Sequence, residues 1–277
     1  MKCISPINIK QKVDGVMSNI PVACGKCYAC QATRRSEWQV RLAVEHRNSK
    51  YSLFVTLTYD DDNLFYLPGS ETPSLDKRAV QLFFKRLRRS LKDARIRYYA
   101  VGEYGTNSFR PHYHILLFSD CTFDIGYISD SWGLGNIQVG KVSDRSISYC
   151  VNYVTVNPSD LQKYSDLSVE KPFALMSRRP GIGAQYFQSG EMVDYHEDDP
   201  DRHFVVINGQ KKKMPRYYSR KIYSARERQK FGERMSYVQQ LRDDAQLEKD
   251  GSSWYQKMAE YHYFRQSLEA RRSKNKL

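Results

Sequence analysis

The 277-residue sequence lacks any apolar run that approaches the roughly 20 residues a transmembrane helix needs. It also has no secretory leader with an apolar core, and no internal repeat. We therefore expect no membrane partner, no solenoid, and a protein that works in the cytoplasm. In that reducing compartment the six cysteines would be free thiols, so a cluster of them indicates metal binding rather than disulfides.

Acidic residues are too few to balance the basic ones. Against 31 Asp and Glu the sequence has 44 Lys and Arg, which gives a net charge of +13. This excess favours a polyanionic partner, nucleic acid before an anionic membrane. The 21 tyrosines and 12 phenylalanines supply rings on which unpaired bases can stack, although composition does not separate that use from ordinary packing.

The hydrophobic periodicity predicts an α+β fold with a central antiparallel sheet flanked by helices, a Cys-rich N-terminal element and a charged helical C-terminal tail. The chain is long enough for one large domain with appendages. Strands are expected at 51–59, 97–103 and 110–118, and helices at 31–47, after a cap at Ser74, and at 144–156 after a cap at Ser143. The acidic segment 191–201 is typical of a solvated loop.

Two histidines alternate along the strand expected at 110–118. His112 and His114 share one face because side chains on a strand repeat every two residues. If the hairpin turns near residues 107 and 108, Glu103 lies opposite His112 on the same face. Two imidazoles and a carboxylate form a set that suits Mg²⁺ or Mn²⁺ with open positions for a phosphate oxygen. The simpler interpretation makes both histidines ordinary sheet residues.

Two tyrosines stand four residues apart on the helix expected at 144–156. Tyr149 and Tyr153 then share a face opposite an apolar one, so the core does not need them. A phenol near a cation is a credible nucleophile for phosphorus, because the cation lowers the cost of forming phenolate. We predict that these two tyrosines are the catalytic nucleophiles.

Four cysteines form a candidate structural metal site near the N-terminus, namely Cys3, Cys24, Cys27 and Cys30. The sequence leaves three interpretations open: structural Zn²⁺, unmetallated thiols and an iron–sulfur cluster. Other residues are candidate DNA contacts because they combine cations with aromatic rings. They are Arg34, Arg35, Arg178, Arg179, Lys211, Lys212, Lys213, Arg216, Tyr217 and Tyr218.

Taken together and in order, five motifs resemble those of the replication initiators of gokushovirus-like microviruses, within the histidine-hydrophobe-histidine (HUH) endonuclease superfamily. The motifs are Cys24–Cys30 with the helix to Glu45, Phe54–Tyr59, Val101–Gly105, Arg110–His114 and Ser177–Gly183. The resemblance implies that the two histidines and Glu103 hold the metal and that the two tyrosines are the family's pair. Asn152 and Val156 replace lysines that are common in that family's tyrosine motif.

The resemblance implies a rolling-circle initiator that nicks single-stranded origin DNA, forms a 5′-phosphotyrosine link, leaves a 3′ hydroxyl primer and rejoins the displaced strand. It implies host helicase and DNA polymerase as partners, in the cytoplasm of a host bacterium. The nickase core is expected at 51–190, with a Cys-rich element and basic helix at 1–50 and an acidic loop, basic segment and tail at 191–277. Two alternatives remain: a zinc-dependent DNA-binding protein without catalysis, and a metal-dependent hydrolase that activates water.

Overall fold

The computed structural model describes residues 3, 5–13, 16–153, 158–199, 202–251 and 253–274. The chain divides into two compact units. The sheet unit consists of Trp38–Gln188, and the terminal unit combines Met1–Glu37 with Ser189–Leu277. The division into 1–50, 51–190 and 191–277 stays a prediction.

The sheet unit is built on five strands in the order β6-β3-β5-β4-β7, and every neighbouring pair is antiparallel. The strands are β3 (Tyr51–Thr58), β4 (Arg97–Tyr104), β5 (Pro111–Ser119), β6 (Ile137–Lys141) and β7 (Phe173–Met176). β5 lies at the centre and carries the two histidines. The α+β fold with a central antiparallel sheet is confirmed.

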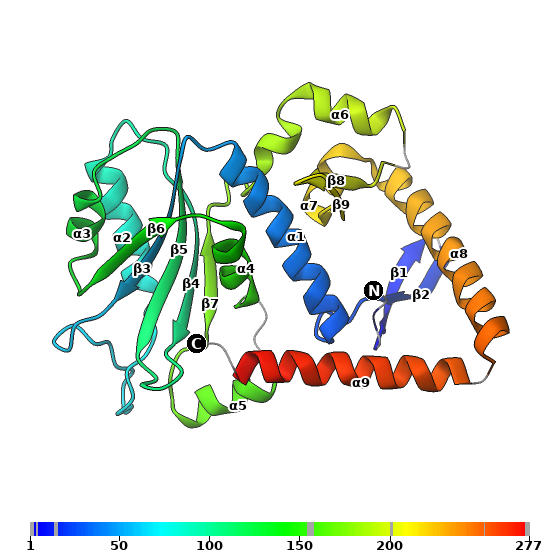
Figure 1. The fold of residues 1–277 in the computed structure, drawn as a ribbon, viewed down its shortest axis with the longest axis horizontal. Helices are drawn as coiled ribbons and strands as arrows, with labels where there is room; N and C mark the ends of the chain where they lie inside the picture. The colour runs from blue at the N-terminus through cyan, green and yellow to red at the C-terminus, as the bar shows by residue number, and fades with distance from the viewer. Residues whose placement is uncertain are drawn as a thin grey trace. The chain divides into compact units, whose positions relative to one another are not determined.

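Helices cover both faces of this sheet (Figure 1). Helices α2 (Lys77–Ser90) and α3 (Gly126–Trp132) pack on one face with the inward residues Val55, Leu57 and Ile115. Helix α4 (Asp144–Asn152) and the second half of α1 (Tyr28–Arg47) pack on the other. The unit also contains α5 (Pro158–Asp166) and the short 3₁₀ helix η1 (Ala184–Phe187). The chemistry lies on the α4 face.

Helix α2 begins two residues after the sequence pattern suggests. Asp76, not Ser74, caps it, because the Asp76 carboxylate accepts the amides of Arg78 and Ala79 at 2.7 and 3.1 Å. Ser74 is buried and accepts the Glu170 amide instead, at 2.9 Å. The apolar stripe predicted for this helix is buried on the sheet. A truncation such as Phe83→Ala in that stripe would cost about 3–5 kcal/mol of stability.

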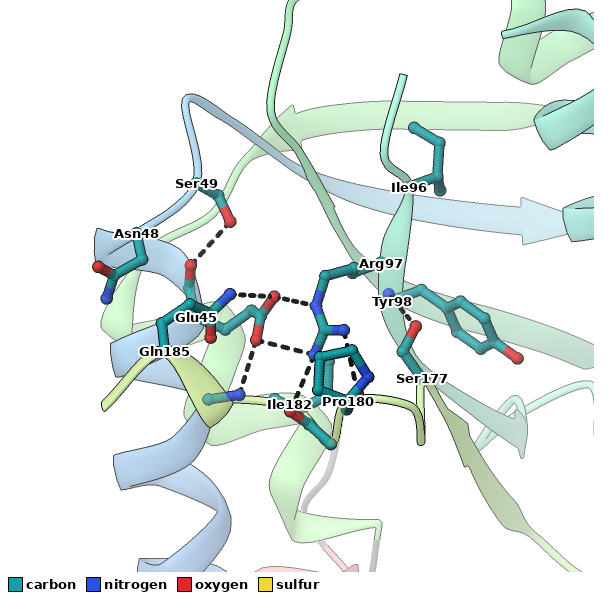
Figure 2. A network of polar contacts seen from close by, with 12 residues as sticks. Glu45, Asn48, Ser49, Ile96, Arg97, Tyr98, Ser177, Pro180, Ile182 and Gln185 are labelled. Atoms are coloured by element: carbon teal, nitrogen blue, oxygen red, sulfur yellow. Dashed lines mark hydrogen bonds and ion pairs between the residues drawn. The ribbon is translucent and has the colours of Figure 1, made fainter. Parts of the chain in front are cut away.

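A buried ion pair ties the segment after β7 to α1 and β4 (Figure 2). The Arg97 guanidinium donates to the Glu45 carboxylate and to the carbonyls of Pro180 and Gly181, at 3.0 and 2.9 Å for the two carbonyls. Glu45 also accepts the Gly183 amide at 2.6 Å and is fully buried. Because these bonds compensate the desolvation of both charges, removal of either partner would cost about 3–5 kcal/mol.

The terminal unit contains two hairpins and four helices among its described residues. They are β1 (Ile7–Val13), β2 (Val16–Val22), α6 (Gly190–Glu197), β8 (Phe204–Ile207), β9 (Gln210–Lys213), α7 (Arg216–Ile222), α8 (Ala225–Asp250) and α9 (Ser253–Lys274). The charged helical tail is confirmed in α8 and α9. Over the described part of the chain, none of the helices combines the length and apolarity required to cross a bilayer.

The prediction of a loop at 191–201 is wrong over most of its length, since α6 occupies Gly190–Glu197. The acidic Glu191 lies in the first turn, where it interacts favourably with the positive end of the helix dipole. His196 is fully buried, and its Nδ1 lies 2.7 Å from the Arg202 carbonyl. Acidic composition concealed a helix that is anchored by this one buried side chain.

Candidate metal centre and tyrosine pair

Three ligand atoms converge on the α4 face of the sheet. Glu103 on β4 is paired directly with His112 on β5, as the hairpin geometry predicted, and His114 is two residues further along the same face. The Glu103 Oε1 atom lies 3.2 Å from His112 Nε2 and 2.8 Å from His114 Nε2. One ligand atom from each residue lies within 4.8 Å of the others. The donor set of two imidazole nitrogens and a carboxylate fits a divalent cation.

The other nitrogen of each imidazole has a partner of its own. His112 Nδ1 lies 3.1 Å from the Arg110 carbonyl, and His114 Nδ1 lies 2.9 Å from the Thr56 hydroxyl. The Phe54 ring stacks on His114 with their centroids 5.4 Å apart. These contacts direct both Nε2 atoms toward Glu103, as outer partners of metal-binding histidines do.

The charge of Glu103 is stabilised where it lies. Burial alone disfavours the carboxylate, but hydrogen bonds from His112 and His114 outweigh burial and lower the pKa of Glu103 to about 2. Burial opposes a charge on His112 as well, yet the neighbouring carboxylate raises the pKa of that imidazole. Glu103 is therefore ionised at neutral pH and available as an anionic ligand.

The tyrosine pair extends this cluster. Tyr149 donates its hydroxyl to Glu103 Oε1 at 2.8 Å and lies 3.3 Å from His114 Nε2. Tyr153, at the C-terminal cap of α4, donates to the Tyr149 hydroxyl at 3.1 Å. Burial, with the Glu103 charge second, raises the pKa of both phenols. The two hydroxyls form a chain that starts at the metal-ligand cluster.

Helix α4 places the pair because its ends and faces are well defined. Ser143 caps it in a capping box with Ser146, as the Ser143 cap predicted. Its apolar face, with Ile147, Cys150 and Val151, is buried on the sheet. The helix ends at Asn152, and the rest of the predicted span, including Val156, falls outside the described residues.

A second cluster lies in the terminal unit, where the thiols of Cys3, Cys24, Cys27 and Cys30 converge within 4.8 Å of one another. The Cys3 and Cys27 sulfurs are 3.8 Å apart, and those of Cys24 and Cys30 are 4.0 Å apart. Four thiolates bound tetrahedrally to zinc at about 2.3 Å would be separated by about 3.8 Å. The cluster therefore could hold a metal of this kind.

Backbone amides also point at the thiols. The amides of Lys26 and Cys27 donate to Cys24 Sγ at 3.4 and 3.3 Å, in a tight turn where Gly25 has a φ of 73°. These hydrogen bonds, the one from Cys27 first, lower the pKa of Cys24 to about 6. An anionic sulfur is the form that binds metal.

The candidate DNA contacts are divided between the two units. Arg178 and Arg179 are exposed in the sheet unit, on the turn that the buried ion pair holds. In the terminal unit Lys211, Lys212 and Lys213 are exposed along β9. The other candidates in that unit are Arg34, Arg35, Arg216, Tyr217 and Tyr218.

Three of these candidates differ in what they expose. Arg216 is exposed and forms an ion pair with Glu37 at 3.3 Å. Tyr217 is half-buried. Tyr218 is fully buried, so its ring packs in the core of the terminal unit and does not present a face to a base. The alternation of inward and outward positions on a short helix explains why two neighbouring tyrosines differ.

Sequence reasoning missed Thr56, Glu45 and Arg97. Thr56 could have been found from the strand periodicity, since it shares a face with Thr58, but its partner depends on the register of β3 with β5. The ion pair between Glu45 and Arg97 joins residues 52 positions apart, and no local pattern indicates it.

Comparisons with known proteins agree with this geometry. The model of a family described as replication-associated protein ORF2 matches residues 52–158, which include both histidines and both tyrosines. Replication-associated protein ORF2 of Spiroplasma virus 4 is 32% identical over 227 residues, which cover 74% of this chain and 68% of that relative. The chain belongs to the microvirus family of replication-associated proteins.

Two other members of the family are more distant. Replication-associated protein VP4 of Bdellovibrio phage phiMH2K is 28% identical over 253 residues, covering 79% of this chain and 76% of that protein. Replication-associated protein ORF4 of Chlamydia phage 1 is 27% identical over 226 residues, covering 72% and 53%. No solved structure matches the chain.

Proposed function

We propose that this chain is a rolling-circle replication initiator of the HUH type, which nicks single-stranded origin DNA and becomes linked to it through a tyrosine. The observation that carries the proposal is the position of Tyr149. Its hydroxyl lies 2.8 Å from Glu103 and 3.3 Å from His114, so a nucleophile and a metal-ligand set share one site. Family membership and the net charge of +13 support DNA as the substrate.

Glu103, His112 and His114 are the residues that would hold Mg²⁺ or Mn²⁺. Such an ion supplies Lewis-acid polarisation of the scissile phosphate. The protein supplies the rest: an ionised Glu103, two imidazoles oriented by their Nδ1 partners, and a phenol already within hydrogen-bond distance of the carboxylate. Positioning of this kind removes much of the entropic barrier to attack.

The transfer exchanges one phosphate ester for another. The oxygen of Tyr149 or Tyr153 bonds to phosphorus, the bond from phosphorus to the 3′ oxygen breaks, and the departing oxygen takes up a proton as a 3′ hydroxyl. The phenolic proton leaves toward Glu103, which accepts the Tyr149 hydroxyl in the structure. The 5′ end stays on the enzyme, the 3′ hydroxyl primes synthesis, and the second tyrosine serves the later cut and rejoining.

The four-cysteine cluster is proposed as a structural Zn²⁺ site. Its sulfur spacing and its amide hydrogen bonds favour a bound metal over free thiols, and four thiolates are a common structural zinc set. Host helicase and DNA polymerase are the partners that the cycle requires, in the cytoplasm of a host bacterium.

The test is covalent capture. Single-stranded DNA that contains the viral origin is incubated with the protein and Mn²⁺ or Mg²⁺, and a denaturant-resistant adduct is sought and its tyrosine mapped by mass spectrometry. The double variant with Tyr149→Phe and Tyr153→Phe should give no adduct. DNA binding without an adduct under all metal conditions would instead support a non-enzymatic, zinc-dependent DNA-binding protein, for which the cysteine cluster is the relevant observation.

A metal-dependent hydrolase would behave differently. It would still cut DNA after both tyrosines are replaced, and its product would carry no protein. The direct hydrogen bond from Tyr149 to Glu103 argues against that outcome.

A further inference from the structure

The Thr56 hydroxyl is the partner of the outer nitrogen of His114. Thr56 on β3 is paired directly with His114 on β5, and its Oγ1 lies 2.9 Å from His114 Nδ1. We propose that Thr56 is a positioning residue, whose hydroxyl decides which nitrogen of His114 carries the proton and so whether Nε2 can bind a metal. The inference rests on the proposed function only in taking His114 as a metal ligand.

The two histidines differ in the kind of partner they have. The Arg110 carbonyl can only accept a hydrogen bond, so it holds a proton on His112 Nδ1 in every state. A hydroxyl can donate or accept, so Thr56 fits either tautomer of His114. His112 is therefore preset for binding through Nε2, whereas His114 can change.

The surroundings of His114 Nε2 explain why such a change is needed. Nε2 lies 2.8 Å from the anionic Glu103 oxygen, and in this arrangement it donates a proton to that oxygen. Thr56 then donates to Nδ1. To bind a cation through Nε2, His114 must carry its proton on Nδ1 instead, and Thr56 becomes the acceptor.

The ring contacts of His114 do not make this choice. Phe54 stacks on one face of the imidazole, and the Tyr149 ring meets it edge-on with their centroids 4.9 Å apart. Both contacts fix the plane of the ring, but neither addresses Nδ1. The hydroxyl of Thr56 is the described group that does.

The strand supplies a matched control. Thr58 is on the same strand and the same face as Thr56, but its hydroxyl donates to the Asn136 carbonyl at 3.2 Å. Thr→Val replaces a hydroxyl by a methyl group of similar size, so both sites can be changed in the same way. Thr56→Ser keeps the hydroxyl, and Thr56→Ala removes it without adding bulk.

The experiment measures Mn²⁺ affinity by calorimetry and the His114 tautomer by ¹⁵N NMR with and without Mg²⁺, on the full chain. Thr56→Val should weaken Mn²⁺ binding by about 10-fold to 100-fold, the range expected when an outer partner of a metal ligand is removed. It should also leave His114 in mixed tautomers when Mg²⁺ is present. Thr56→Ser should restore both properties, and Thr58→Val should match the unmodified protein.

Wild-type affinity together with the wild-type tautomer in Thr56→Val would overturn the proposal. If that variant does not fold, Thr56→Ser and Thr56→Ala make the same comparison, and equal affinities in that pair would overturn it as well. The covalent adduct is scored separately. Thr56-dependent metal binding without an adduct in the unmodified protein would contradict the nickase function and leave this inference standing.

Discussion

The two clusters of metal-ligand residues in this chain differ in what surrounds them. In the sheet unit, Glu103, His112 and His114 combine nitrogen and oxygen donors, and a tyrosine hydroxyl reaches Glu103 directly. In the terminal unit, four sulfurs are surrounded by backbone amides that donate to them. A three-residue set leaves coordination positions for a substrate, whereas four thiolates fill a tetrahedral ion. The first cluster is arranged for chemistry and the second for holding the chain together.

The largest effect is expected when the carboxylate is removed from the first cluster. Glu103→Ala should lower the rate of adduct formation by about 1000-fold, equivalent to about 4 kcal/mol, because it removes the anionic ligand and the acceptor of the Tyr149 hydroxyl. Gel quantification of the adduct over time measures this rate. Glu170→Ala, at an exposed ion pair with Lys77, is the control. A Glu103→Ala protein that keeps its rate would remove the distinction between the clusters.

The two tyrosines should not be equivalent. Tyr149→Phe should slow the first cleavage by at least about 100-fold, or about 2.7 kcal/mol, because Tyr149 is the phenol that contacts Glu103 and His114. Tyr153 reaches these residues through the Tyr149 hydroxyl, so Tyr153→Phe should affect the first cleavage less and the rejoining step more. Peptide mapping of the adduct identifies the linked residue. A first adduct found mainly on Tyr153 would reverse this order.

Loss of a thiol should affect structure and leave chemistry largely intact. Cys27→Ser should abolish zinc binding and make the N-terminal segment susceptible to trypsin, since structural zinc contributes folding free energy directly. Adduct formation should change by less than about tenfold, below 1.4 kcal/mol. Zinc content by mass spectrometry and digestion at Lys26 report the first effect. Cys121→Ser, at an exposed cysteine outside the cluster, is the control; an equal loss of zinc there would show that the cluster is not the site.

The sequence predicted the parts of the fold that depend on local periodicity. The β4–β5 hairpin and the pairing of Glu103 with His112 follow from alternation and a turn, and the Ser143 cap follows from the preference for serine at that position. Thr56 could not be placed in the same way, because its contact with His114 depends on strands that are not adjacent in sequence. Pairings of this kind are set by tertiary packing.

Two local predictions failed because tertiary contacts outweighed composition. Residues 190–197 form a helix that buries His196, although their acidity suggested a loop. Tyr218 is buried, although its basic neighbours suggested a stacking surface. In both cases one face of a short helix packs on the core of its unit, and charge counts along the chain do not record which face that is.

The smallest effects are expected from the exposed cations, and they compare the units as DNA-binding surfaces. Arg178→Ala with Arg179→Ala in the sheet unit should lower the slope of log affinity against log salt by about one for each DNA phosphate that is no longer neutralised, with a comparable decrease for each lysine replaced among Lys211, Lys212 and Lys213. Fluorescence anisotropy with single-stranded DNA over a salt series measures the slope. The cleavage rate at saturating DNA should not change, because cations far from the reacting atoms act on binding. A unit whose cations leave the slope unchanged does not bind the DNA backbone through them, and the other unit then carries the DNA.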